Sequence, residues 1–153
     1  RLDSPQTVRM VSHVGKREAR HCSAVGKALL AHLDDDDIAW IVEVKGLPRF
    51  TSQTITDPAA LRDELERVRR QGYAIDDQEG EEGIRCVGAP IFDWAGQPVA
   101  AISVAAPVFR TPIEKLHAVA PALLDAAAAI SQRLGYRGRS VARPPAVERG
   151  ERA

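Results

Sequence analysis

The 153-residue chain is poor in cysteine and has no long apolar segment. Its two cysteines, Cys22 and Cys86, do not form a CxxC pair, and two thiols are too few for a disulfide framework. No run of about 18 apolar residues is available to span a membrane. The opening stretch, RLDSPQTVRM, also lacks the apolar core of a signal peptide. These absences predict a cytoplasmic protein that does not insert into a membrane.

The chain also lacks a net charge, because its 21 basic residues are balanced by 21 acidic ones. The balance is uneven along the sequence: residues 137–153 are basic and residues 1–136 are mildly acidic. Domains that bind nucleic acid carry a basic face. We therefore expect residues 1–136 not to bind DNA themselves. Residues 137–153 are rich in Arg and Pro, with too little apolar surface to fold alone, and we expect them to form a flexible tail.

Signatures for catalysis and for metal or cofactor binding are missing. Gly26-Lys27 matches the end of a phosphate-binding loop, but His21 stands at the upstream glycine position and Ala28 follows the lysine, which excludes that loop. The four histidines show no zinc-ligand spacing. Cys86 has no histidine near it in the sequence to act as its base. We therefore expect no catalytic residues, no metal and no cofactor.

Helix and strand signals predict a single domain of the α+β class. Hydrophobic residues make up 44% of the chain and charged residues 27%, an ordinary globular composition. The predicted strands are residues 7–14, 73–75, 84–92 and 98–106, and the predicted helices are residues 23–33, 34–45, 57–71 and 111–134. The last three strands follow one another through short turns, so we expect them to pair antiparallel.

Helical spacing predicts which side chains are buried. The expected inward residues are Val25, Leu29 and Leu30 in the first helix, Leu61, Leu65 and Val68 in the third, and Leu116, Val119, Leu123, Leu124, Ala127, Ile130 and Leu134 in the last. Glu64 is expected to face water. Ser23 and Asp57 are predicted N-caps, and Thr111 with Glu114 is predicted to form a capping box.

The most distinctive stretch is residues 72–90, GYAIDDQEGEEGIRCVGAP, an acidic turn between two predicted strands. We expect Asp76 to leave the first strand and Cys86 to lie in the second. A carboxylate and a thiol at the mouth of a hairpin form either a small-molecule site or a solvated loop beside a buried thiol. The residues by themselves leave both interpretations open.

Four sequence blocks, in order, resemble the effector-binding domain of IclR-family bacterial transcriptional regulators: HCSAVGKALLAHL, GLPRFTSQTITDPAAL, GYAIDDQEGEEGIRCVGAPIFDWAG and AAISVAAP. The resemblance covers residues 2–136. It implies a GAF-like, profilin-like fold with an antiparallel sheet of about six strands flanked by helices. It also implies a homodimer or homotetramer that binds DNA only through an N-terminal winged helix-turn-helix domain. This chain contains no candidate for that domain, which we expect to lie outside it.

Matched block by block, the resemblance places the effector contacts on Ala24, Val25, Asp76, Cys86 and Ser103. The ligands it implies are small organic or aromatic acids. Backbone amides at the start of the helix after Ser23 can hold a carboxylate. An ionised Asp76 would repel that carboxylate, so we expect Asp76 to accept a hydrogen bond from a ligand hydroxyl or a bridging water.

One departure from the family pattern bears on the ligand. The family often has Ser-x-Ser in the last strand, whereas this chain has Ser103-Val104-Ala105. The lost hydroxyl favours an aromatic or partly apolar acid over a small, densely polar one. The candidate wall residues are Met10, Val25, Ile102 and Ala105.

Three functions remain as hypotheses at this point. The first is a ligand-sensing and oligomerisation domain that modulates DNA binding by another domain. The second is an oligomerisation-only module with a vestigial pocket. The third is a GAF-like redox sensor or enzyme that uses Cys86, together with Cys22.

Overall fold

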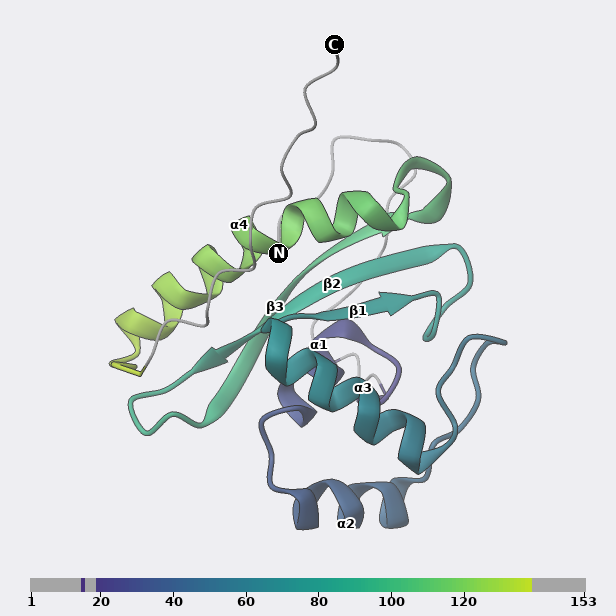
Figure 1. The fold of residues 1–153 in the computed structure, drawn as a ribbon, viewed down its shortest axis with the longest axis horizontal. Coiled ribbons are helices and arrows are strands. Elements are labelled where there is room, and N and C mark those ends of the chain that lie inside the picture. Colours follow the sequence, from purple (N-terminus) through teal and green to yellow (C-terminus); the bar gives the residue numbers. More distant parts are fainter. Residues whose placement is uncertain (1–14, 16–18, 139–153) are drawn as a thin grey trace.

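The computed structural model describes residue 15 and residues 19–138, which form a small sheet between two layers of helices (Figure 1). The helices are α1 (Ala24–Leu30), α2 (Asp35–Lys45), α3 (Pro58–Gln71) and α4 (Ile113–Arg133), and a 3-10 turn, η1, covers Val108–Arg110. The strands are β1 (Ala74–Asp77), β2 (Ile84–Phe92) and β3 (Pro98–Pro107). No helix in the described part of the chain is long and apolar enough to cross a membrane.

The three strands form an antiparallel sheet in the order β1-β2-β3, which confirms the predicted α+β class. The resemblance implied about six strands, and the described residues form three. The strand predicted at residues 7–14 lies outside the described residues, as does the tail from residue 139 onward. Within the described chain, β3 is therefore an edge strand.

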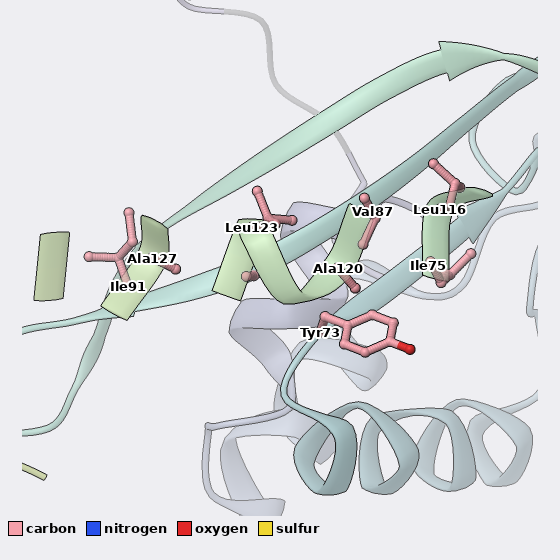
Figure 2. Close-up of a cluster of buried hydrophobic side chains, with 9 residues drawn as sticks. Tyr73, Ile75, Val87, Ile91, Leu116, Ala120, Leu123 and Ala127 are labelled. Carbon is pink, nitrogen blue, oxygen red and sulfur yellow. The ribbon is translucent and has the colours of Figure 1, made fainter. Parts of the chain in front are cut away.

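One face of the sheet packs against α4 (Figure 2). Alternate residues of a strand point to the same face, so Ile75, Val87 and Ile91 all meet this helix. Each buried aliphatic side chain of this kind contributes about 1.5–3 kcal/mol. The buried residues of α4 recur with helical spacing; they are Leu116, Ala120, Leu123, Ala127 and Ser131.

The opposite face of the sheet is covered by α1, and α3 packs against α1 (Figure 1). A second apolar cluster lies here, made of Ala28, Leu30, Ala31, Leu61, Leu65, Val68 and Ala74. The predicted inward residues of α3 are all among them. The N-caps are also confirmed: Ser23 Oγ accepts from the amide of Gly26 at 3.2 Å, and Asp57 Oδ2 accepts from the amide of Ala60 at 2.8 Å.

The predicted buried face of α1 is confirmed for Leu30 and wrong for Val25 and Leu29. Its buried residues are Ala24, Gly26, Lys27, Ala28 and Leu30, whereas Val25 and Leu29 are only half-buried. Position 26 requires glycine, because the helix lies against the backbone of the preceding residues there. A Cβ atom on Gly26 would lie 2.3 Å from the carbonyl oxygen of Arg20.

The start of α4 also differs from the prediction. Thr111 does not cap the helix; Pro112 occupies the N-cap position and makes no side-chain capping bond. Thr111 is buried and lies one residue before the N-cap. Its carbonyl oxygen accepts a hydrogen bond from Arg85 Nη1 at 3.1 Å. Two residues of the predicted buried stripe, Ile130 and Leu134, are 38% and 46% exposed because Ser131 takes the inward position there.

Replacing Gly26 with alanine tests the close approach of α1. Helix propensity alone predicts that Gly26→Ala stabilises the protein by about 0.5–1 kcal/mol. The clash with the Arg20 backbone should reverse the sign and cost about 3 kcal/mol. Gly46→Ala is the comparison, because no atom of the described chain lies within 4 Å and its cost comes from the positive φ of 66° alone. Urea unfolding measures both, and a stabilised Gly26→Ala protein would contradict the packing.

Candidate functional site

The strand register places four of the predicted site residues on one face of the sheet. Asp76 pairs with Cys86, and Cys86 pairs in turn with Ala105. Ser103 pairs with Gly88, two residues further along the same face. Asp76, Cys86, Ser103 and Ala105 therefore all point to the side of the sheet that α1 covers.

The start of α1 lies directly on this face. A Cβ atom on Gly88 would lie 2.8 Å from the carbonyl carbon of Ala24 and 3.0 Å from the amide nitrogen of Val25. The absence of a side chain at Gly88 therefore allows the helix to approach. Ser23 caps the amide of Gly26, and the amides of Ala24 and Val25 are the other donors at the start of the helix.

The structure thus brings together Ala24, Val25, Asp76, Cys86, Ser103 and Ala105, which come from α1 and all three strands. Two predicted wall residues are not part of this group. Ile102 pairs with Ala89 and packs against the α4 cluster on the other face. Met10 lies outside the described residues.

Asp76 does not leave the strand as expected. It lies within β1, is 6% exposed, and its Oδ1 accepts a hydrogen bond from the amide of Glu79 at 2.8 Å. The turn after β1 folds back over it, because a Cβ atom on Gly80 would lie 3.7 Å from Asp76 Oδ2 and 3.8 Å from Cys22 Sγ. The Asp76 carboxylate is therefore buried, whereas Ser103 and Ala105 lie on the edge strand β3 and are exposed to solvent.

A buried ion cluster joins α1, α3 and the turn after β1, and it was not predicted from the sequence. Lys27 is 1% exposed, and its Nζ donates to Glu64 Oε1 at 3.0 Å and to Glu79 Oε1. Glu64 Oε2 in turn pairs with Arg67. Glu64 was expected to face water, and that expectation is wrong. The available signal was the position of Lys27, which follows Ala24 and precedes Ala31 with the spacing of a buried helical face.

Glu79 has an unusual electrostatic environment. Its side chain is 10% exposed, and its buried Oε2 has no hydrogen-bond partner among the residues that the structure describes. Burial raises the pKa of Glu79, and the nearby charges of Asp76 and Glu64 act in the same direction, whereas Lys27 opposes them.

The loop before α3 holds the acidic turn in place. Thr51 Oγ1 donates to the carbonyl oxygen of Gln78 at 2.7 Å, and Thr54 Oγ1 donates to that of Glu79 at 2.7 Å. Gln78 has a φ of 64°, in the left-handed region that is unfavourable for residues other than glycine, and these hydrogen bonds stabilise that conformation. Two residues that looked like ordinary loop positions therefore support the site.

The face under α1 carries both polar and apolar groups. The backbone at the start of α1, the Ser103 hydroxyl and the buried Asp76 carboxylate lie beside Gly88, Ala101 and Ala105. In the described part of the chain, no three His, Cys, Asp or Glu side chains gather closely enough to hold a metal. A cavity of about 250 Å³ lies elsewhere, between α2 and α3. Five of its ten lining residues are charged, the other five are apolar, and none of them is a predicted site residue.

Comparison with known proteins gives a consistent result. A family model described as bacterial transcriptional regulator IclR C-terminal matches residues 1–132. The HTH-type transcriptional regulator BhcR of Paracoccus denitrificans is 43% identical over 129 residues, which are 84% of this chain and 46% of BhcR. The chain spans about half the length of the curated relatives that it matches.

Solved structures agree with the sequence comparison. The crystal structure of IclR from Thermotoga maritima matches with a TM-score of 0.81 and 38% identity, over 86% of this chain and 53% of that one. The inducer-binding domain of the PobR transcription factor from Acinetobacter matches with a TM-score of 0.76 and 30% identity, over 84% of this chain and 76% of that one. That domain was solved as a double mutant in complex with 3-hydroxybenzoic acid. These relatives are regulators of transcription, not enzymes.

Replacing Lys27 with methionine tests the ion cluster. Lys27→Met leaves the buried Glu79 carboxylate without its cation and Glu64 with only the half-exposed Arg67, and we expect it to cost about 3–5 kcal/mol in unfolding free energy. Lys45→Met is the control, because Lys45 is exposed at the end of α2 and its loss should change stability by less than about 0.5 kcal/mol. Adding Glu79→Gln to Lys27→Met should recover part of the loss, and no recovery would contradict the pairing.

The raised pKa of Glu79 predicts a pH effect on stability. The folded state holds this proton more tightly than the unfolded state, whose carboxyl titrates near 4.5. The stability that Glu79 contributes is therefore present below pH 4.5 and is lost as the pH rises through the folded pKa. Relative to Glu79→Gln, the wild-type protein should become less stable over that interval in urea unfolding. Glu82→Gln, an exposed change in the same turn, should follow the wild type.

Proposed function

Because this chain belongs to the IclR family of bacterial transcriptional regulators, we propose that it is the effector-sensing and self-associating domain of such a regulator. The resemblance seen in four sequence blocks is confirmed by the family match. The observation that carries the functional proposal is the convergence of Ala24, Val25, Asp76, Cys86 and Ser103. These residues are far apart in the sequence and lie on one face of the sheet under α1.

The ligand we propose is a small organic acid, with an aromatic acid favoured. The amides of Ala24 and Val25 and the hydroxyl of Ser103 are donors suited to a carboxylate. The neighbouring Gly88 and Ala105 supply small apolar surface beside these donors. The related PobR domain, whose structure contains 3-hydroxybenzoic acid, supports this ligand class.

Asp76 has a separate role in this proposal. Its carboxylate would repel a ligand carboxylate in contact with it, so the acid group lies at the helix start and not at Asp76. A ligand hydroxyl, or a water bound to the ligand, donates to Asp76. A hydroxylated acid can therefore place its carboxylate at the start of α1 and donate its hydroxyl to Asp76.

Occupancy acts on DNA binding through the rest of the regulator. We propose that the protein is a cytoplasmic homodimer or homotetramer and reaches DNA only through a winged helix-turn-helix domain. Exposed apolar side chains support self-association, since Trp40 on α2 is 60% exposed and Phe50 after it is 54% exposed. The ligand shifts the regulator between two states only by the difference in its affinity for them.

A thermal-shift screen of organic and aromatic acids tests the proposal. A ligand that binds only the folded state at about 100 times its Kd adds about 2.7 kcal/mol of stability, a rise of several degrees in Tm. The rise should disappear in Ser103→Ala and in Asp76→Asn, which keeps an oxygen for the Glu79 amide.

Val104→Ala is the matched control for that screen. Val104 is the next residue in β3, but it pairs with Val87 and points to the α4 side. Its truncation should leave the ligand-induced rise intact. If no acid raises the Tm of the wild-type protein, the oligomerisation-only function replaces the sensor.

A further inference from the structure

Helix α2 leaves an unfilled space between itself and the rest of the fold. It lies wholly within the described part of the chain, and none of its side chains is buried. A cavity of about 250 Å³ separates it from α3, which is its neighbour in Figure 1. Protein interiors contain few voids larger than a water molecule. A space of this size therefore calls for an occupant from outside the molecule.

The cavity has an apolar floor and a charged rim. Leu65 of α3 is buried, and Ile38 and Val42 of α2 are half-buried, so these three side chains form the floor. The charged lining residues are all exposed and form the rim; they are Asp35, Glu43, Arg62, Glu66 and Arg69. A well-matched occupant is therefore apolar over most of its surface and carries a polar group for the rim.

The side chain of tryptophan has this combination of properties. Its rings are apolar, its N–H donates to an acceptor such as a carboxylate, and its ring face attracts a guanidinium group. Benzene fills an apolar cavity of about 150 Å³, so the cavity beside α2 has room for the larger indole. An aliphatic side chain would fill the floor but offer nothing to the charged rim.

The chain presents such a tryptophan next to the cavity. Trp40 is 60% exposed, follows the lining residue Ala39 directly and precedes the lining residue Glu43 by three positions. Residues three apart on a helix are neighbours on its surface. Trp40 is not itself among the lining residues, so it does not fill the cavity of its own molecule. Val44, which is 52% exposed, extends the apolar surface along the helix.

We propose that two copies of this chain associate through α2, with Trp40 of each copy inserted into the cavity between α2 and α3 of the other. The inference rests on the proposed self-association and names the surface that makes it. One two-fold axis relates the two insertions, so the same surface is used by both copies and the contact closes as a dimer.

The charges along α2 favour this symmetry. The helix begins with the acidic run Asp35–Asp37 and ends with Lys45. Arg69 Nε donates at 2.6 Å to the carbonyl oxygen at the C-cap of α1, which places the end of α3 near the start of α2. Arg62, two turns earlier in α3, therefore lies toward the end of α2. Arg69 and Glu43 reduce this contrast between the two ends without reversing it. A two-fold axis across the middle of α2 brings the acidic start of each helix to the basic end of the other.

The area of the contact is sufficient for a weak dimer. A buried tryptophan removes about 150–250 Å² from solvent, so the two copies of Trp40 supply about 300–500 Å². A specific interface needs roughly 1,000 Å², and the facing surfaces of α2 and α3 supply the remainder. An interface at this lower limit forms a dimer at concentrations of about 1 μM or above.

Sedimentation equilibrium of this chain from about 1 μM to about 1 mM tests the contact. The wild-type protein should pass from monomer to dimer as the concentration rises. Trp40→Ala should weaken the dimer by about thirtyfold or more, as the loss of a central tryptophan does in other interfaces. Trp94→Ala is the matched control, because Trp94 is 79% exposed in the turn after β2. It should keep the wild-type dissociation constant, and circular dichroism checks that both variants are folded.

A mixing experiment tests the insertion itself. Ala39 is exposed and lines the cavity, so Ala39→Gln should block the cavity while leaving Trp40 in place. Ala39→Gln alone should dimerise as weakly as Trp40→Ala alone. Mixed together, the first variant supplies the tryptophan and the second supplies the open cavity, so the mixed dimer should form more tightly than either homodimer. Ala128→Gln, the same change at an exposed position of α4, should behave as the wild type.

The outcomes separate this inference from the proposed function. A wild-type oligomer that Trp40→Ala does not weaken overturns the inference and leaves self-association standing on another surface. A mixed dimer no tighter than the homodimers overturns the insertion into the cavity. If the wild-type protein is monomeric at every concentration, both the inference and the proposed self-association fail and the cavity has a different occupant, while the thermal-shift screen still decides whether the domain senses an acid.

Discussion

The buried ammonium of Lys27 joins the three parts of the chain that surround the candidate site. It lies on α1 and pairs with Glu64 on α3 and with Glu79 in the turn after β1. A lysine that is 1% exposed is tolerated only with such partners, because burial removes its hydration. These pairs tie α1 to α3 and to the turn after β1, and the first residues of the helix lie over Gly88.

Close backbone approach is the second constraint. A Cβ atom on Gly26 would meet the Arg20 backbone, and a Cβ atom on Gly88 would meet the backbone of Ala24, so α1 packs closely against both the preceding chain and the sheet. The same closeness brings the amides of Ala24 and Val25 down to the sheet. The geometry that stabilises the ion cluster is therefore also the geometry that presents donors to a ligand.

Local signals in the sequence were sufficient to predict the four α-helices and three strands of the described residues and their order, because caps and turns act over a few residues. Strand β2 has the predicted bounds, and Ser23 and Asp57 cap their helices as expected. The burial of Glu64 could not be predicted this way. Its partner Lys27 is 37 residues away, and a charged residue on a helix looks solvent-exposed until the opposite charge that faces it is known.

The site residues themselves show what strand alternation can and cannot provide. Ser103 and Ile102 are neighbours in one strand, so they point to opposite faces and cannot line the same pocket; that correction to Ile102 was available from the sequence. The convergence with Asp76 and Cys86 was not, because it depends on the register of two strand pairs. The same alternation sends Ile102 and Val104 away from the site and leaves Ala101, Ser103 and Ala105 facing α1. Because β3 thus supplies only small side chains, selection among acids of different shape must come from α1 and from the turn that Glu79 holds.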